Sequence, residues 1–169
     1  FTVANEEKTK KLIQAQKRHM HIGVPGHGIV IAVPIKSVGG GKTVAFLNGE
    51  TDNAAYTPSL NYAHELIVAV CSQGCTDMVM NAARAAGARG GTVLHGKGTG
   101  AKGAPKFYNI TIAQEKEMIL IVAAASQKAA IMQSILKKAG PDSKAGTIVF
   151  SLPTTQVAGF ALLDNQDET

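Results

Sequence analysis

Short apolar runs alternate with amphipathic stretches along the second half of the chain. Residues 66–71 form a β-branched apolar run of strand length, which predicts a buried strand. Residues 76–87 follow, with a threonine first, an acid in the first turn and a glycine at the end. This pattern predicts a helix of about three turns that Thr76 caps and Gly87 ends.

The next stretch changes from apolar to glycine-rich. Residues 91–95 read Gly-Thr-Val-Leu-His and predict a second strand. Residues 96–105 are too rich in glycine to hold regular structure. We therefore expect the chain to leave the sheet in a flexible loop that begins at residue 96.

A second strand–helix–strand series follows the loop. Residues 117–123 predict a strand, Ser126 is the expected N-cap of the next helix, and Gly140 with Pro141 is expected to stop it. Residues 147–152 predict a fourth strand. This order predicts an α+β, ferredoxin-like split βαβ fold, in which two helices cover one face of four antiparallel strands. The other face of such a sheet needs a partner.

The chain also repeats itself. A shift of 119 residues places residues 1–40 on residues 120–159 without a gap. The matching pairs include Val3 with Val122, Ala4 with Ala123, Gln14 with Gln133, Ile29 with Ile148, Val30 with Val149, Pro34 with Pro153, Val38 with Val157 and Gly40 with Gly159.

The repeat predicts three parts of the chain. Residues 1–41 are expected to be the C-terminal half of a first unit, residues 42–62 a connector, and residues 63–169 a complete unit. A lone strand–helix–strand cannot bury its own apolar face. We therefore expect the first unit to have another half that this sequence does not contain.

Composition places the chain among globular proteins. Of its 169 residues, 45% are hydrophobic, which is enough to bury a sizeable core. Only 17% are charged, so part of the surface is expected to be an oligomer interface. The sequence has neither a signal segment nor a run of roughly 18 apolar residues that could span a membrane. We expect a cytoplasmic protein without membrane insertion.

The formal charge of +5 comes largely from two lysine-rich stretches, at residues 8–18 and 97–106. Aromatic side chains are not interleaved with these lysines, as they are on many nucleic-acid-binding surfaces. We interpret the lysines as a solvated helix face and as phosphate-sized anion sites. No DNA or RNA binding is expected.

The residue types that commonly bind metals do not form a recognisable set. Cys71 and Cys75 have neither a second cysteine pair nor a suitably spaced histidine pair to complete a zinc site, so two free thiols are expected. His19, His21 and His27 lie near the end of the first helix, where imidazoles either bind a metal or favour the helix C-terminus. No carboxylate or cysteine converges on them, so we assign no metal site.

The sequence also lacks familiar catalytic motifs. It has no Gly-x-Ser-x-Gly elbow, no His-Glu-x-x-His and no pair of acids at a persuasive spacing. A thiol enzyme would need a base beside its cysteine, and the sequence identifies none. Residues 39–43 are not a P-loop, because Lys36 stands where that pattern has its first glycine. We predict a protein that is not an enzyme and requires no cofactor.

Three passages together resemble one protein family. Residues 86–93 lead into Gly-Lys-Gly-Thr-Gly at 96–100, and this passage is similar to the entry into the mobile T-loop of the PII (nitrogen regulatory) signal-transduction family. Residues 144–153 and 25–34 are similar to the B-loop and last strand of that family. Over most of its length the chain resembles a divergent tandem-repeat member.

The resemblance implies a homo-oligomer, a trimer, that holds an adenine nucleotide as its effector in clefts between subunits. The residues it assigns to the nucleotide are Thr92, Lys97, Gly98 and Gly100 before the T-loop, and Lys144, Gly146 and Thr147 in the B-loop. Glycine lets backbone N–H groups approach an anion, and lysine adds a mobile positive charge. Residues 157–161 replace the family's phosphate-binding arginines, which favours a monophosphate, a diphosphate or a cyclic nucleotide over ATP with magnesium.

The function implied by the resemblance is regulation of nitrogen metabolism. Ligand binding would order the loop from residue 96 to about 105, and a partner protein would meet its ordered or its mobile form. Two alternatives stay open. One is a metal-responsive ferredoxin-like trimer resembling the CutA group, and the other is a purely structural assembly module.

Overall fold

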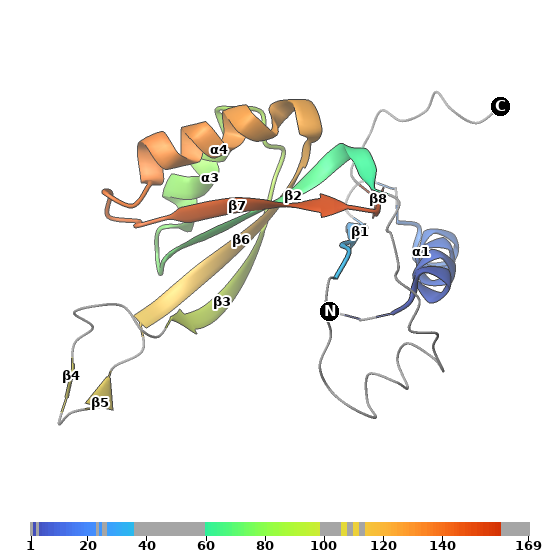
Figure 1. Ribbon diagram of the computed structural model, residues 1–169, viewed down its shortest axis with the longest axis horizontal. Coiled ribbons are helices and arrows are strands. Elements are labelled where there is room, and N and C mark those ends of the chain that lie inside the picture. The colour runs from blue at the N-terminus through green and yellow to red at the C-terminus, as the bar shows by residue number, and fades with distance from the viewer. Residues whose placement is uncertain are drawn as a thin grey trace. The chain divides into compact units, whose positions relative to one another are not determined.

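The computed structural model describes residues 2, 4–22, 24, 27–35, 60–98, 106–107, 110–111 and 114–159. The chain forms two compact units. One is Tyr62–Leu152, and the other combines Phe1–Asn61 with Pro153–Thr169. Figure 1 shows the helices and strands of both units.

A four-stranded sheet and two helices make up the unit Tyr62–Leu152. The elements in chain order are β2 (Asn61–Ser72), α3 (Thr76–Arg84), β3 (Thr92–Gly98), β6 (Gln114–Ala124), α4 (Ala125–Ala139) and β7 (Ile148–Thr154). The strand order is β3-β6-β2-β7, so each βαβ half has a strand of the other half between its own two strands. The predicted α+β, ferredoxin-like split βαβ fold is confirmed. A short ladder of β4 (Lys106–Phe107) and β5 (Ile110–Thr111) lies between β3 and β6 in the sequence.

Neighbouring strands of the sheet run antiparallel. β6 pairs in this way with both β2 and β3. The Ser72 N–H at the end of β2 donates to the Ala145 carbonyl just before β7, whereas Glu65 near the start of β2 bonds to Ser151 within β7. β2 and β7 are therefore antiparallel as well. The end of β3 and the start of β7 thus lie at the same end of the sheet, on its two opposite edges.

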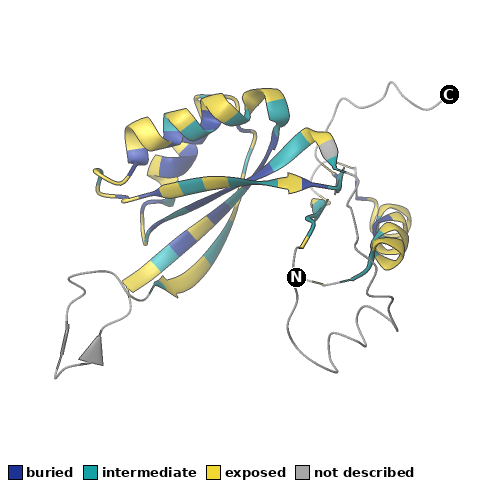
Figure 2. Cartoon of the chain, viewed as in Figure 1, coloured by how far each residue is buried: buried dark blue, intermediate teal, exposed yellow. Residues whose placement is uncertain are grey.

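The core of this unit lies between the sheet and its helices (Figure 2). Successive residues of a strand point to opposite faces, so Ile67 and Ala69 of β2 face the helices together with Ile119 and Ile121 of β6. All four side chains are fully buried. The helices contribute Val79, Met80, Ala82 and Ala83 from α3 and Ile131, Ile135 and Ala139 from α4.

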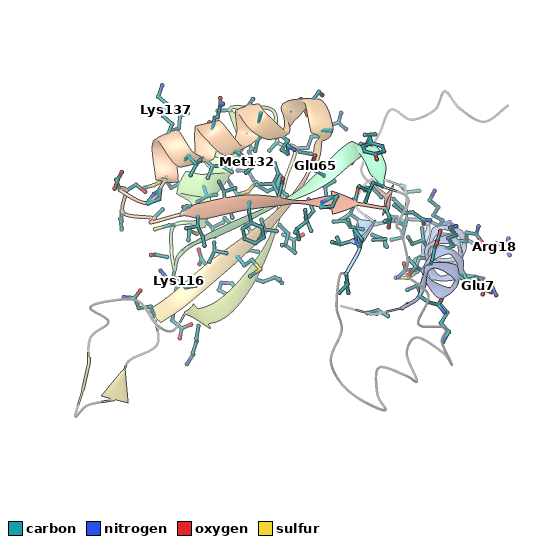
Figure 3. All side chains as sticks on the ribbon, in the orientation of Figure 1. Glu7, Arg18, Glu65, Lys116, Met132 and Lys137 are labelled. Carbon is teal, nitrogen blue, oxygen red and sulfur yellow. The ribbon has the colours of Figure 1, made fainter. Side chains whose placement is uncertain are left out.

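Polar contacts fix α4 against its neighbours. Ser134 Oγ donates to the Ala82 carbonyl of α3 at 2.7 Å. Lys128 Nζ of α4 lies 2.7 Å from Glu65 Oε1 of β2, and Glu65 is labelled in Figure 3. Its hydrogen bond from Lys128 holds the pKa of Glu65 below the ordinary value. These contacts tie both helices to the same face of the sheet.

The opposite face of the sheet carries exposed apolar side chains. Met118 alternates with the buried Ile119, so it points to the face without helices. Ile148 and Phe150 flank Val149, which packs against the core, so they point to that face too. Their side chains are 39%, 58% and 43% exposed for Met118, Ile148 and Phe150 respectively. This group is called the open-face residues below.

Both predicted helix caps are wrong. α3 has Cys75 at its N-cap, and Thr76 is its first helical residue. The strand β6 continues directly into α4 with Ala124 at the N-cap, so Ser126 lies within the first turn. Tertiary packing overrides the local capping preference at both starts, and at α3 a distant carboxylate takes the role of the cap, as described below. The predicted end of α4 at Gly140 is confirmed.

Two predicted element ends also differ from the structure. α3 ends at Arg84, and a turn follows in which Gly87 has a φ of +102°, a conformation that favours glycine. β3 continues to Gly98, so the predicted loop start at residue 96 is wrong. The backbone of residues 96–98 pairs with β6, and this pairing holds glycines that local preference assigns to a loop.

The second unit has a helix and a two-stranded ladder among its described residues. α1 (Glu6–Met20) begins at the N-cap Asn5, whose side chain accepts the Lys8 N–H at 2.9 Å. β1 (Val30–Ala32) pairs antiparallel with β8 (Gln156–Ala158). The small apolar cluster of this unit consists of Ile13, Ile22 and Ala158. In the part of the chain that the structure describes, no helix is both long and apolar enough to cross a membrane.

The sequence repeat has a structural counterpart. Adding 119 to the bounds of α1, residues 6 and 20, gives 125 and 139, which are the bounds of α4. The same shift places β1 within β7. The predicted domain boundaries stay a prediction, and most of the predicted connector lies outside the described residues.

Candidate functional site

The predicted nucleotide-binding residues fall into two groups in the unit Tyr62–Leu152. The first group lies on β3 and comprises Thr92, Lys97 and Gly98. The second lies in the turn between α4 and β7, residues 140–147, and comprises Lys144, Gly146 and Thr147. This turn is called the α4–β7 turn below. Gly100 is outside the described residues.

The α4–β7 turn is held together by its own backbone. The Gly146 N–H donates to the Ser143 carbonyl and the Thr147 N–H donates to the Ala139 carbonyl, both at 3.0 Å. Gly146 has a φ of +54°, a left-handed conformation that side chains other than glycine adopt with strain. The two N–H groups that the sequence suggests for an anion are thus engaged within the turn. The exposed side chain of Lys144 is the group here that can reach an anion.

Thr147 is fully buried at the base of this turn. Its hydroxyl has no hydrogen-bond partner among the described residues, and a side chain without solvent exposure does not reach a dissolved ligand. The predicted contact between Thr147 and a nucleotide therefore stays a prediction. The buried side chain of Thr147 does not support it. Its buried position instead suits a role in anchoring the start of β7.

The candidate residues on β3 lie at its two ends. Lys97 pairs with Glu115 of β6, and its Nζ lies 3.5 Å from Glu115 Oε1, with both side chains well exposed. Exposed ion pairs contribute at most about 1 kcal/mol, so Lys97 can exchange this partner for a ligand at little cost. Gly98 is adjacent to Lys97, but Thr92 is six residues before Gly98. At about 3.3 Å per residue, Thr92 lies about 20 Å away, at the other end of the strand.

Lys97 and the α4–β7 turn share one end of the sheet but not one edge. β3 and β7 are the two outer strands, with β6 and β2 between them. Three strand spacings of about 4.8 Å separate the outer strands by about 14 Å. A single copy of this unit therefore does not bring Lys97 and Lys144 into one small site.

A buried carboxylate lies between these two positions and was not predicted. Glu117 of β6 is 7% exposed and accepts hydrogen bonds from the N–H of Gly74 at 3.1 Å and from the N–H of Thr76 at 3.2 Å. The Thr76 hydroxyl also donates to it, at 2.6 Å. The hydrogen bonds from the Thr76 hydroxyl and from the Gly74 N–H hold the pKa of Glu117 below its ordinary value. Glu117 thereby satisfies the amino end of α3.

The sequence contained a signal for this residue. Strand alternation places Glu117 on the same face as Ile119 and Ile121, which is the buried face of β6. A glutamate at such a position requires hydrogen-bond donors, and the start of α3 supplies them. His95 of β3 adds a contact, with Nε2 at 3.7 Å from Glu117 Oε1.

The turn between β2 and α3 connects the two candidate positions. The Ser72 N–H donates to the Ala145 carbonyl in the α4–β7 turn at 2.9 Å. Lys116 Nζ donates to Ser72 Oγ at 3.2 Å, and Figure 3 labels Lys116 near the start of β6. The Gln73 N–H donates to the Glu115 carbonyl at 3.3 Å. A continuous set of hydrogen bonds therefore runs from the α4–β7 turn to the strand that pairs with Lys97.

The two cysteines are both buried free thiols. Burial, more than the nearby Glu117 carboxylate, raises the pKa of the Cys71 thiol to about 11. At neutral pH almost all of Cys71 is then the unreactive thiol form. This environment does not favour a nucleophilic or redox role for Cys71.

The histidines of the second unit include one pair in contact. The rings of His21 and His27 have their centroids 6.3 Å apart, and His27 Nδ1 lies 3.3 Å from the Met20 carbonyl. Among the described residues, no group of three or more histidine, cysteine, aspartate and glutamate side chains is placed to hold a metal ion. A pair of imidazoles alone is a weak set of metal ligands.

Comparison with known families gives one match. The family model "Nitrogen regulatory protein P-II" matches residues 64–160, which run from within β2 past the end of β8 and include both groups of candidate residues. A comparison with curated proteins finds no significant match. The matched region is 97 residues, from 64 to 160, and so exceeds half of the 169-residue chain. The chain therefore belongs to the nitrogen regulatory protein P-II family.

Proposed function

We propose that the chain is a PII-like regulator of nitrogen metabolism that binds a small anionic effector in clefts between copies of itself. Proteins of the P-II family are regulators rather than enzymes. The effector that fits the residues best is an adenine nucleotide, and no further cofactor is required. A partner protein binds the connection between β3 and β6, whose conformation depends on whether the effector is bound. The regulator acts in the cytoplasm and does not catalyse a reaction on its ligand.

The observation that carries this proposal is the position of the two lysines. Lys97 and Lys144 lie at the same end of the sheet on opposite edges, about 14 Å apart across the strands. When a second copy places its β3 edge beside the α4–β7 turn of the first, Lys97 of one copy and Lys144 of the other face one cleft. This arrangement gives an effector two cations that neither copy provides alone.

The positive charge available in such a cleft favours an effector with one or two phosphate groups. The N–H groups of Gly146 and Thr147 donate within their own turn, so the lysine side chains supply the main attraction. Two lysines neutralise a monophosphate or diphosphate more completely than a triphosphate. We therefore favour AMP, ADP or a cyclic adenine nucleotide over ATP with magnesium.

The open-face residues support association into a homo-oligomer, for which we propose a trimer. Met118, Ile148 and Phe150 form an apolar group on one side of a sheet whose other side is covered by α3 and α4. Burying such side chains stabilises an assembly by roughly 1.5–3 kcal/mol for each large side chain that becomes fully covered. Three copies cover their open faces against one another and form three equivalent clefts.

A ligand screen by thermal shift and calorimetry tests this function. The purified chain is titrated with ATP, ADP, AMP, cyclic AMP and 2-oxoglutarate. A bound ligand at 100 times its dissociation constant is expected to stabilise the folded state by about 2.7 kcal/mol. Lys97→Ala and Lys144→Ala should each weaken binding by about tenfold, the loss of about 1.4 kcal/mol from one charge-assisted hydrogen bond.

Lys17→Ala is the matched control, because Lys17 is an exposed lysine on α1, outside the unit that holds the two candidate lysines. It should leave the affinity unchanged. Binding that neither Lys97→Ala nor Lys144→Ala weakens would refute the proposed site. A response to copper or zinc alone would favour a metal-responsive trimer, and no response to any ligand would leave a structural assembly module.

A further inference from the structure

The strand β8 pairs with a strand from the other end of the chain. It follows β7 after a single residue, Thr155. A hairpin between consecutive strands commonly needs a loop of at least about two residues, so β8 does not fold back onto β7. It pairs instead with β1, in the register Val30↔Ala158, Ile31↔Val157 and Ala32↔Gln156. β8 therefore depends on an acceptor strand other than the strand that precedes it.

The internal repeat identifies an equivalent acceptor within β7. Adding 119 to residues 30–32, which accept β8 in β1, gives residues 149–151 of β7. β7 is an outer strand of its sheet, and among the described residues no strand lies along its other edge. An edge of this kind presents backbone groups to which another strand can be added. Residues 149–151 thus offer the position that β8 occupies on β1.

The backbone groups of β7 are oriented for this pairing. The Ser72 N–H of β2 donates to the Ala145 carbonyl just before β7, and Ser72 lies on the open face, since the helix-facing residues of β2 are odd-numbered. Paired residues of neighbouring strands face the same side, so the β7 residues that bond to β2 are also those of the open face, such as Phe150. The backbone groups of Val149 and Ser151 alternate with these and point to the free edge.

The ladder of β1 and β8 uses the equivalent edge of β1. The Thr155 N–H donates to the Ala32 carbonyl at 2.9 Å, so the backbone groups of Ala32 point toward β8. Ala32 corresponds in the repeat to Ser151, whose backbone groups point to the free edge of β7. The two acceptor strands therefore match in orientation as well as in position.

The side chains around β8 also have counterparts beside β7. Ala158 is 5% exposed and forms an apolar cluster with Ile13, and Val30 packs against this cluster. The equivalents of Ile13 and Val30 are Met132, which Figure 3 labels, and Val149. Both are partly buried at the margin of the main core. The β7 edge thus offers the same kind of apolar site to a side chain in the position of Ala158.

The exposure of Phe150 differs from that of its equivalent in the same direction. Ile31, which has Val157 as its neighbour across the ladder, is partly buried. Phe150 corresponds to Ile31 and is 43% exposed. A strand added to β7 in the same register places Val157 beside Phe150 on the open face.

We propose that the free edge of β7 binds β8 of a second copy of the chain, and that this β8 leaves β1 of its own copy. The register follows from the repeat: Val149↔Ala158, Phe150↔Val157 and Ser151↔Gln156. One three-residue ladder replaces an equivalent one, and exchange of an identical element is a low-cost route to association. The contact joins different surfaces of the two copies, so it is head-to-tail and agrees with a closed trimer.

This inference rests on the homo-oligomer proposed above and deepens it by naming the strand that joins the copies. It does not depend on the effector. The ligand screen and the strand exchange are measured separately, so either can fail without the other.

Disulfide formation between two singly substituted chains tests the register. Phe150→Cys and Val157→Cys are mixed at a concentration where the original chain is oligomeric, and then oxidised. A bond between positions 150 and 157 can then form only between two copies. Non-hydrogen-bonded neighbours in an antiparallel ladder have Cα atoms about 4.5 Å apart, which lies within the range of disulfides. We expect a covalent dimer on a non-reducing gel, with the 150–157 link identified by mass spectrometry.

Val149→Cys mixed with Val157→Cys is the matched control, because position 149 faces the opposite side of β7. Its yield of the mixed disulfide should be at least about tenfold lower. The native Cys71 and Cys75 are buried and present in every chain, so they contribute equally to each mixture. Equal yields in the two mixtures, or the absence of a 150–157 link, would overturn the proposal.

A second variant leaves Phe150 intact and therefore stands even if Phe150→Cys does not fold. Ile31→Cys combined with Val157→Cys in one chain allows a disulfide that holds β8 on β1. The oxidised chain should self-associate at least about tenfold more weakly than the same chain after reduction, as measured by sedimentation velocity. An oxidised chain with this internal disulfide that associates as strongly as the reduced chain would refute the exchange of β8.

Discussion

At the scale of single residues, Glu117 is the clearest case of a group whose role depends on distant neighbours. Its carboxylate is buried in an otherwise apolar face of β6, and it is stabilised by donors from the start of α3, more than forty positions earlier in the chain. A buried charge is costly without such partners. Glu117 therefore fixes where α3 begins and joins that start to the strand beside Lys97.

Replacing Glu117 by glutamine should destabilise the fold by about 1–3 kcal/mol at pH 7, because an amide cannot accept all the hydrogen bonds that the carboxylate accepts. The folded-state pKa of Glu117 is lowered, so its contribution is present above the unfolded-state pKa of about 4.5 and is lost as the pH falls through the lower folded-state value. The difference between wild type and Glu117→Gln should therefore shrink below about pH 4.5.

Urea unfolding at pH 7 and at several values between pH 5 and pH 3 measures this difference. Glu115→Gln is the control, since Glu115 is an exposed glutamate two residues earlier on the same strand, and it should change the free energy of unfolding by less than about 0.5 kcal/mol. A difference for Glu117→Gln that stays constant down to pH 3 would show that the charge of Glu117 is not the cause.

At the scale of elements, the entry into β3 shows how closely the strand follows α3. A side chain at Gly91 would place its Cβ 3.0 Å from Met80 Sδ and 3.1 and 3.2 Å from Ile119 and Ile121. The neighbouring Gly90 has nothing within 4 Å of such a Cβ. The absence of a side chain at Gly91 lets the start of β3 pass close to the core. Gly90 lies in the connection before β3 and is not in contact with the core.

Gly91→Ala should lower the free energy of unfolding by about 1–3 kcal/mol, as expected for an added methyl group in a packed core. Gly90→Ala is the matched control and should be neutral or slightly stabilising, because alanine reduces the freedom of the unfolded chain. Chemical denaturation of both variants measures the effect. Equal stabilities would mean that the core around Met80 is loose enough to accept the methyl group.

At the scale of the whole molecule, the main sheet has one face that helices cover and one face that carries exposed apolar side chains. α3 and α4 bury one side, while the open-face residues Met118, Ile148 and Phe150 stay exposed on the other. The low content of charged residues, 17%, agrees with a surface of which part is covered by other copies. The same assembly would form the clefts in which we propose that the effector binds.

Phe150→Ser should weaken self-association, raising the dissociation constant by about tenfold to a hundredfold, because aromatic side chains at the centre of interfaces contribute most to binding. Leu136→Ser is the control, since Leu136 is 45% exposed on α4, on the side of the unit covered by helices. Sedimentation velocity over a range of concentrations measures both. An unchanged oligomer in Phe150→Ser would place the interface elsewhere.

Local pattern was sufficient to predict the four strands of the main sheet in Tyr62–Leu152, its two helices and their order, but not the short ladder of β4 and β5. Most of these strands contain apolar runs, the helices are amphipathic, and the interleaved βαβ plan follows from the order of the elements. The family match over residues 64–160 agrees with the resemblance carried by the glycine-rich passages. These features depend on neighbours within a few residues, so they can be recognised before the chain is folded.

The structure alone decided which residues meet across the chain. Glu117 rather than a Thr76 cap satisfies the start of α3, β3 runs on through Gly96 to Gly98, and Thr147, which the sequence assigned to the nucleotide, is buried. Each result depends on a partner from another strand or helix. The sequence by itself determined the main elements of the sheet unit and the family, whereas the separation of Lys97 from Lys144 arises from strand order, which acts between residues far apart in the chain.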